Sequence, residues 1–373
     1  MRNGRKWRLE TMFLPMFLCV SALCAAQTDH LTSFSDPARL WGNGIERVIE
    51  EAFRQCFRTR IIDGKIMNIR LPFAENHERE VLLETGWKFF ADGKAGPDRL
   101  WSEIEKLLDS PDFQKYISEL SSGRERVFIF DIPEQKWSYS VELFDIARMK
   151  AGSYRGLPHR PYVMTSGRGA LESDVYNYLY CIGHFGVDCS GFVWYILTYI
   201  GTQGGIDLGR TLNSVIGAPR GVDPAIYVGT SFFDSRNSQI IAVDDQIRNL
   251  RPADILLFRS ETGQMAHSAI IQSVDFTNGV IRYLQCTDEA PLEERGVHES
   301  FIHFNPSNPS VSLKDPSLLW TQKRFAPFPG EKDSPFSDDG ERYRAYTDIS
   351  GGGRVVRIRA LIPVIEKINS RRH

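Results

Sequence analysis

Residues 186–201 read GVDCSGFVWYILTYIG, and this stretch carries the strongest fold signal in the chain. Apolar residues stand at positions 192, 193, 196, 197 and 200, which is the spacing of one buried helix face. Gly201 is typical of the end of such a helix. The pattern therefore predicts a core helix that begins at Cys189 and ends near Gly201.

Cys189 stands where unpaired N–H groups and the positive end of the helix dipole would stabilise a thiolate. The position predicts a lowered pKa for this thiol, and hence a stronger nucleophile near neutral pH. Asp188 is suited to cap the helix, and Gly191 would let a substrate approach the backbone. The alternative interpretation is that Cys189 is a small buried apolar residue, as most cysteines are.

Three strands are predicted downstream of this helix. Residues 250–258 read as a turn followed by a buried strand, and 265–274 as a second strand with His267 at its start. A third strand over 280–286 follows the turn signal Asn278-Gly279. Because a thiolate nucleophile needs a base within hydrogen-bond reach, His267 is the candidate base.

These segments resemble the NlpC-type cysteine peptidases of bacterial cell walls, through DCSGF at 188–192, PADILLF at 252–258 and the strand-opening His267. The resemblance covers roughly residues 155–290 and implies an α+β, papain-like domain, in which a Cys-bearing helix packs on an antiparallel sheet. It implies hydrolysis of peptide bonds in peptidoglycan stems, typically after γ-D-glutamate. Carried over, Cys189 is the nucleophile, His267 is the base, and Gln285 is the third residue that orients the histidine.

Strand parity constrains the third residue. In a hairpin with a two-residue loop at Asn278-Gly279, Gln285 would face away from His267. A three-residue loop with a left-handed Gly279 returns Gln285 to the face of His267. The Gln285 assignment therefore predicts an odd-length loop, and His298 and His303 remain alternatives for the third position.

Three further residues are candidates for substrate binding. Residues 161–167 resemble the family's Y-x-x-G-G segment, and Tyr162 could hydrogen-bond to the substrate or be a core tyrosine. Asp188 and Ser190 flank the nucleophile. They could bind the amine or carboxylate of a stem peptide, or serve only as helix caps.

The chain departs from the family pattern at several places. Ala253 replaces the glycine of P-G-D, and Ser268-Ala269 replaces Val-Gly after the histidine. Cys189 and His267 are 78 residues apart, which is consistent with an insertion near 201–245. An insertion beside a cleft commonly reshapes specificity.

The 373 residues divide into three predicted parts. Basic residues at 2, 5, 6 and 8 precede an uncharged run that closes with small residues, so 1–26 are predicted to be a signal peptide, with an uncleaved anchor or a lipoprotein signal as alternatives. Residues 27–153 are predicted to be a mixed α/β accessory region, with helical spacing over 100–120 and strands at 126–132 and 137–144. The catalytic domain is predicted over 154–373, with a closing strand within 354–362.

Composition excludes some partners and scaffolds. The 45 Lys and Arg nearly balance the 47 Asp and Glu, so no basic field points to a nucleic acid. Four cysteines follow the predicted signal, too few for a disulfide scaffold, and Cys181 and Cys286 could pair or stay reduced. The eight histidines show no zinc-like spacing, so we predict no metal and no other cofactor.

The sequence thus predicts an exported cysteine peptidase, periplasmic or in the cell envelope, that acts on peptidoglycan peptides and has no membrane span after signal cleavage. One alternative is a CHAP-type amidase that cuts the sugar–peptide amide or a cross-bridge. Another is a wall-binding scaffold without catalysis, against which the retention of both Cys189 and His267 argues.

Overall fold

The computed structural model describes one compact unit, Asn43–His373, in part. The described residues are 44–73, 97–120, 126–131, 136–140, 159–164, 170–182, 186–260, 262–287, 296–324, 334–337, 344–347 and 351–371. The predicted signal peptide, 1–26, lies outside them. No helix among the described residues is long and apolar enough to span a membrane.

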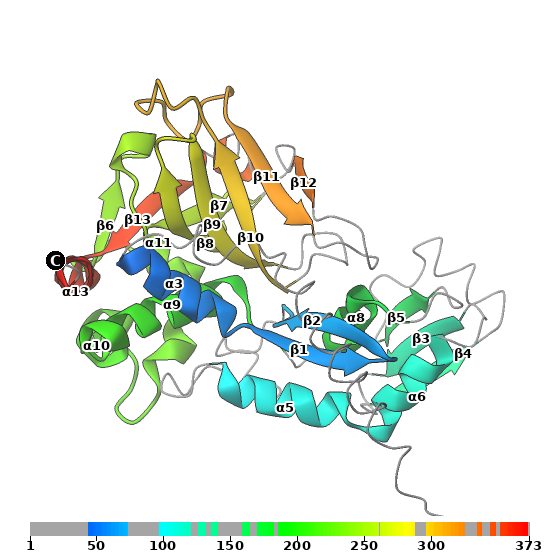
Figure 1. The fold of residues 1–373 in the computed structure, drawn as a ribbon. Coiled ribbons are helices and arrows are strands. Elements are labelled where there is room, and N and C mark those ends of the chain that lie inside the picture. The colour runs from blue at the N-terminus through cyan, green and yellow to red at the C-terminus, as the bar shows by residue number, and fades with distance from the viewer. Residues whose placement is uncertain are drawn as a thin grey trace, which may run out of the picture. The chain divides into compact units, whose positions relative to one another are not determined.

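The largest sheet of the described residues has eight strands (Figure 1). Its strand order is β12-β11-β10-β9-β8-β7-β13-β6, and every neighbouring pair is antiparallel. The strands are β6 (Ile240–Val243), β7 (Ile255–Arg259), β8 (Met265–Asp275), β9 (Val280–Thr287), β10 (Gly296–His303), β11 (Leu319–Arg324), β12 (Ser334–Ser337) and β13 (Arg354–Ile358). The α+β class with a helix on an antiparallel sheet is confirmed, as are the three predicted strands and the closing strand.

Helix α9 (Cys189–Gly204) packs on one face of this sheet beside α3 (Ile45–Arg54) (Figure 1). Their apolar side chains share a core with β7, β8 and β9, for example Ile49, Phe192 and Ile270. The helix does not end at Gly201 as predicted. It continues for almost another turn, to Gly205, whose left-handed backbone (φ 86°) ends it.

A second core lies on the opposite face of the sheet, because side chains alternate along each strand. The rings of Phe258, Trp320 and Tyr346 form its aromatic part, with ring centroids 5.6–6.0 Å apart. Tyr346 comes from the short helix α12 (Arg344–Thr347).

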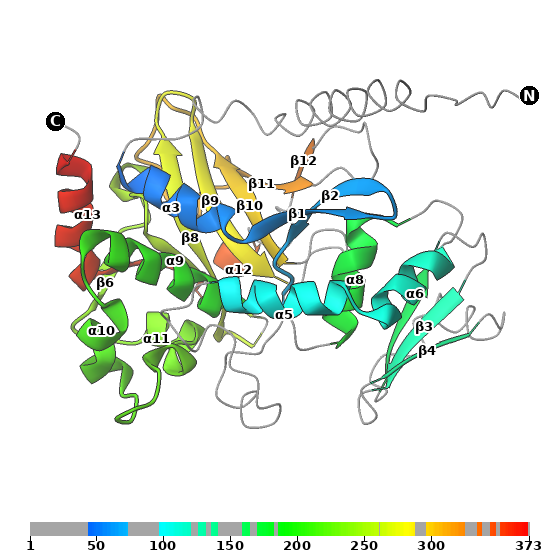
Figure 2. The same ribbon diagram turned by 60° about the horizontal axis from the view of Figure 1, so that its bottom comes forward.

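Residues 201–245, the predicted insertion, are folded and packed into the first core. They contain α10 (Leu208–Ile216), the 3₁₀ turn η2 (Pro224–Tyr227), α11 (Thr230–Asp234) and the sheet strand β6. Leu208, Leu212 and Phe233 are fully buried in the core that contains α9, and Figure 2 shows α10 and α11 near that helix. The C-terminal helix α13 (Ile362–Ser370) also packs against α9.

The residues before 154 form smaller elements. They are the hairpin β1 (Phe57–Ile62) and β2 (Lys65–Arg70), the helices α5 (Asp98–Leu108) and α6 (Pro111–Leu120), and the strands β3 (Arg126–Asp131) and β4 (Lys136–Ser140). Strand β5 (His159–Met164) pairs with β3, and helix α8 (Glu172–Ile182) follows. The predicted helical segment at 100–120 is confirmed with its break at Ser110-Pro111, and so are both predicted strands.

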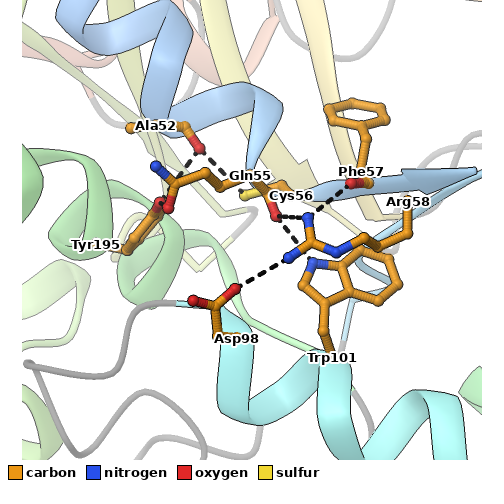
Figure 3. Close-up of polar contacts among 8 residues, drawn as sticks. All are labelled: Ala52, Gln55, Cys56, Phe57, Arg58, Asp98, Trp101 and Tyr195. Atoms are coloured by element: carbon orange, nitrogen blue, oxygen red, sulfur yellow. Dashed lines mark hydrogen bonds and ion pairs between the residues drawn. The ribbon is translucent and has the colours of Figure 1, made fainter.

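The first core contains residues from both sides of the predicted boundary near residue 153. Figure 3 shows Gln55, at the end of α3, joining three elements: its side-chain oxygen accepts a hydrogen bond from the Tyr195 hydroxyl of α9 (3.0 Å). Its backbone carbonyl accepts from the Trp101 ring of α5 (2.8 Å), and Arg58 of β1 forms an ion pair with Asp98 (2.9 Å). Residues 45–73 and the helix that carries Cys189 are therefore parts of one packed unit.

Candidate active site

Cys189 is the first residue of α9, as predicted, and Asp188 is its N-cap. An Asp188 oxygen accepts hydrogen bonds from the Gly191 N–H (2.5 Å) and from the Ser190 hydroxyl (3.3 Å). Asp188 and Ser190 are 3% and 1% exposed. Asp188 therefore caps α9, and Ser190 donates to the cap; their role in substrate binding stays a prediction.

Two segments far from α9 in sequence contact the Cys189 sulfur. The thiol lies 3.9 Å from the Ala266 carbonyl oxygen, next to His267 on β8, and 3.7 Å from the Thr230 hydroxyl of α11. The cysteine is 8% exposed.

Burial raises the pKa of the Cys189 thiol to about 12, and the Asp188 carboxylate adds to the rise. Nearby hydrogen-bond donors from Ser268 and Thr230 act in the opposite direction and offset only part of it. The predicted lowering of this pKa is therefore wrong. A helix N-terminus favours a thiolate, but here the loss of water and an adjacent negative charge outweigh it.

His267 is held by two hydrogen bonds in series on neighbouring strands. Its Nε2 lies 2.8 Å from Oε1 of Gln285 on β9, and Nε2 of Gln285 donates to the Ser300 hydroxyl of β10 at 2.7 Å. Because an amide oxygen only accepts, the imidazole Nε2 must carry the hydrogen and Nδ1 is left as the basic nitrogen. The structure thus brings His267 and Gln285 together, and the Gln285 amide also donates to Ser300.

Gln285 faces His267 as predicted, but the predicted odd-length loop is wrong. The loop between β8 and β9 has four residues, 276–279, and Asp275 pairs with Val280, so its length is even. A β-bulge between Ile271 and Ser273 adds one residue to β8 and shifts the register. This shift returns Gln285 to the face of His267, while Gly279 has the predicted left-handed backbone (φ 68°).

The imidazole packs against Phe258 of the second core, with ring centroids 5.4 Å apart. Cys189 heads the helix that covers the first core, and its sulfur reaches the backbone beside His267 at the start of β8. The Cys189 sulfur and the imidazole therefore lie toward opposite faces of the sheet, and the contact of the sulfur on β8 is with the backbone beside His267.

The other predicted candidates have different surroundings. Nδ1 of His298 lies 2.9 Å from the Gly296 carbonyl oxygen, and Nε2 of His303 lies 3.2 Å from the Thr321 hydroxyl. The residue bonded to His267 is Gln285, as first assigned. Tyr162 lies on β5 opposite Phe128, and since its side chain falls outside the described residues, its role stays a prediction.

Two more cysteines are described, and both are reduced. The Cys286 thiol donates to the Val187 carbonyl oxygen at 3.0 Å, and the Cys56 thiol to that of Ala52 at 3.9 Å. Burial raises the pKa of both thiols. Cys286 therefore forms no disulfide with Cys181, whose own side chain lies outside the described residues.

Sequence reasoning missed three contributors to the site: Thr230, Ser300 and the segment after β2. The Pro72 carbonyl accepts from the Val187 N–H and the Leu71 carbonyl from the Val297 N–H, both at 3.0 Å. Residues 71–72 therefore connect the chain just before Cys189 with strand β10. No motif signals these contacts, because each joins residues that are far apart in the chain or in neighbouring strands.

Ala253 stands where the resemblance predicts the glycine of P-G-D, and its backbone shows why glycine would fit there. It has a left-handed backbone (φ 73°), a conformation that glycine adopts without strain. Asp254, fully buried after it, forms an ion pair with Arg357 of β13 at 2.6 Å. Among the described residues, no group of three or more His, Cys, Asp or Glu side chains is placed to hold a metal ion.

Comparison with known proteins gave no match: no protein-family model, no curated protein and no solved structure matches the chain. The resemblance to NlpC-type peptidases therefore rests on the quoted sequence segments alone.

Proposed function

We propose that the protein is an exported cysteine peptidase that hydrolyses peptide bonds in peptidoglycan stem peptides, with a papain-like catalytic arrangement. One observation carries the proposal: Cys189 opens a core helix with its sulfur against residue 266, and the adjacent His267 is bonded to Gln285. A nucleophile, a base and a group that orients the base are the three parts that thiol catalysis requires.

In this proposal, Nδ1 of His267 accepts the proton of the Cys189 thiol as the sulfur attacks the substrate carbonyl carbon. The S–H bond breaks, and a C–S bond and an N–H bond form. The imidazolium then protonates the leaving amine, the peptide C–N bond breaks, and water hydrolyses the thioester. The raised pKa of the resting thiol means that ionisation depends on this transfer to the imidazole, since few thiolates exist beforehand.

The backbone supplies a donor for the oxyanion. The N–H groups of the first helical residues have no partner within the helix, so the Cys189 N–H can bond to the developing negative charge. Gln285 cannot carry a charge. It therefore sets the imidazole orientation through its oxygen, and its amide nitrogen is held in place by the hydrogen bond to Ser300.

The substrate class is taken from the motif resemblance and from the predicted export signal. A γ-D-glutamyl bond to a diamino acid is the bond that we expect to be cut. The role of residues 27–153 in substrate binding is open to test with the same assay.

The test is digestion of purified peptidoglycan fragments by the full mature chain and by Cys189→Ala. We expect wild-type protein to expose a new diamino-acid amine, detected by mass spectrometry, and Cys189→Ala to lose activity by at least about a thousandfold. Cys56→Ala, which removes another buried thiol, is the matched control and should retain activity.

Two results would overturn the proposal. Wall-digesting activity in pure, folded Cys189→Ala would remove the nucleophile assignment. Release of an intact stem from the glycan would identify the protein as an amidase of the CHAP type instead.

A further inference from the structure

The insertion brings a hydroxyl to the nucleophile. Thr230 is the first residue of α11, is 8% exposed, and holds its hydroxyl oxygen 3.7 Å from the Cys189 sulfur. Residues 201–245 thus take part in the candidate site itself.

Helix α11 is anchored on three sides, so this hydroxyl has a defined position. Phe232 packs edge-to-face on Trp194 of α9, with ring centroids 6.5 Å apart, and Phe233 is fully buried. At the other end of α11, Asp234 forms an ion pair with Arg354 of β13 at 2.6 Å. A threonine held this way is preorganised toward the sulfur.

The hydrogen-bond directions around the sulfur follow from the partners. A thiol has one hydrogen, and the Ala266 carbonyl oxygen can only accept it. With that hydrogen on Ala266, the contact with Thr230 is made by the threonine O–H pointing at sulfur. When the thiol loses its proton, the same O–H faces a full negative charge, and hydrogen bonds to charged groups are about twice as strong as neutral ones.

We propose that the Thr230 hydroxyl donates a hydrogen bond to the ionised Cys189 sulfur, so that the insertion supplies a catalytic residue to the site. The inference rests on the proposed function, in which the sulfur is the attacking atom. Asp188 is the charged group that opposes this effect, because its carboxylate disfavours the thiolate.

The experiment measures the rate at which iodoacetamide alkylates Cys189 in the full mature chain at pH 8, with the labelled peptide identified by mass spectrometry. Thr230→Val keeps the shape and removes the donor, so we expect the rate constant to fall about tenfold. Thr230→Ala removes the same donor without added bulk and should give the same fall. Thr230→Ser keeps the hydroxyl and should stay within about twofold of wild type.

Thr202→Val is the matched control, because it removes an exposed threonine hydroxyl from α9 that bonds only locally, to the Thr198 carbonyl (3.0 Å). It should leave the alkylation rate unchanged. Wild-type alkylation rates in Thr230→Val and Thr230→Ala would overturn the proposal. So would an equal fall in Thr230→Ser, since that would assign the effect to packing of the methyl group.

Alkylation does not depend on peptide hydrolysis, so the two proposals fail separately. If wild-type protein cuts no peptidoglycan but Thr230→Val still slows alkylation, the peptidase proposal fails and the hydrogen bond stands. If wild-type protein and Thr230→Val hydrolyse fragments at the same kcat, Thr230 is not catalytic although the peptidase proposal stands.

Discussion

The His267 side of the site lies on three adjacent strands, β8, β9 and β10, whereas the Cys189 side is assembled from segments far apart in the chain. On the first side, His267, Gln285 and Ser300 form a continuous series of hydrogen bonds. On the second side, the sulfur is set by α9, α11 and residue 266, and the segment at 71–73 supports the chain before it.

The two sides also differ in charge. Cys189 is buried beside a carboxylate, which keeps the sulfur protonated at rest. The orientation of His267 is fixed by neutral groups, the Gln285 amide and the Ser300 hydroxyl behind it. In the proposed mechanism, sheet register therefore orients the base, and the base must activate the nucleophile.

The largest effect is expected from removing the base. In His267→Ala the sulfur has no proton acceptor, so hydrolysis should fall about a thousandfold, and Cys189 alkylation at neutral pH should fall with it. Parallel assays of both reactions measure this. Loss of hydrolysis with unchanged alkylation would mean that the ring and the sulfur exchange no proton.

A smaller loss of activity is expected when the hydrogen-bond series from His267 through Gln285 to Ser300 is shortened. Gln285→Ala leaves the imidazole free to rotate, and kcat should fall about a hundredfold with little change in KM. Ser300→Ala removes the hydrogen bond that holds the Gln285 amide, and should lower kcat about tenfold. Equal kcat in wild type and both variants would show that these hydrogen bonds do not contribute to catalysis.

The support behind the nucleophile is tested at Gly296. This residue has a left-handed backbone (φ 105°), and a Cβ there would lie 2.5 Å from the Leu71 carbonyl oxygen. Gly296→Ala should lower the free energy of unfolding by about 2 kcal/mol, measured by urea denaturation. The control is Gly217→Ala, a site with a similar φ of 75° but open space around the added carbon, which should show the backbone strain alone.

The smallest effect is expected from Asp188→Asn, which removes the charge of this residue but keeps its capping group. Asn caps helices as well as Asp, so Asp188→Asn should leave α9 intact while removing the charge that raises the Cys189 pKa. Because loss of this carboxylate lowers the Cys189 pKa and favours the thiolate, Asp188→Asn should increase the alkylation rate several-fold. Slower alkylation in Asp188→Asn would show that the carboxylate does not raise the Cys189 pKa.

Local patterns in the sequence were enough to identify the helix that carries Cys189 and the strands that carry His267 and Gln285, because hydrophobic period and turn residues are properties of neighbouring positions. The bulge at residue 272 was not predictable, since it depends on how two strands pair. The thiol pKa was mispredicted for a related reason: a helix start can be read from sequence, but burial of its first residue cannot.

Hydrophobic spacing and turn residues indicated where the helix and strands of the site begin, and predicted that these elements form an antiparallel α+β unit. The contacts of Thr230 and Ser300 with the site, and the core that residues 45–73 share with it, became visible only in the folded chain. The physical reason is that periodicity records which side of an element is apolar, whereas a contact between distant segments depends on the packing of all of them together.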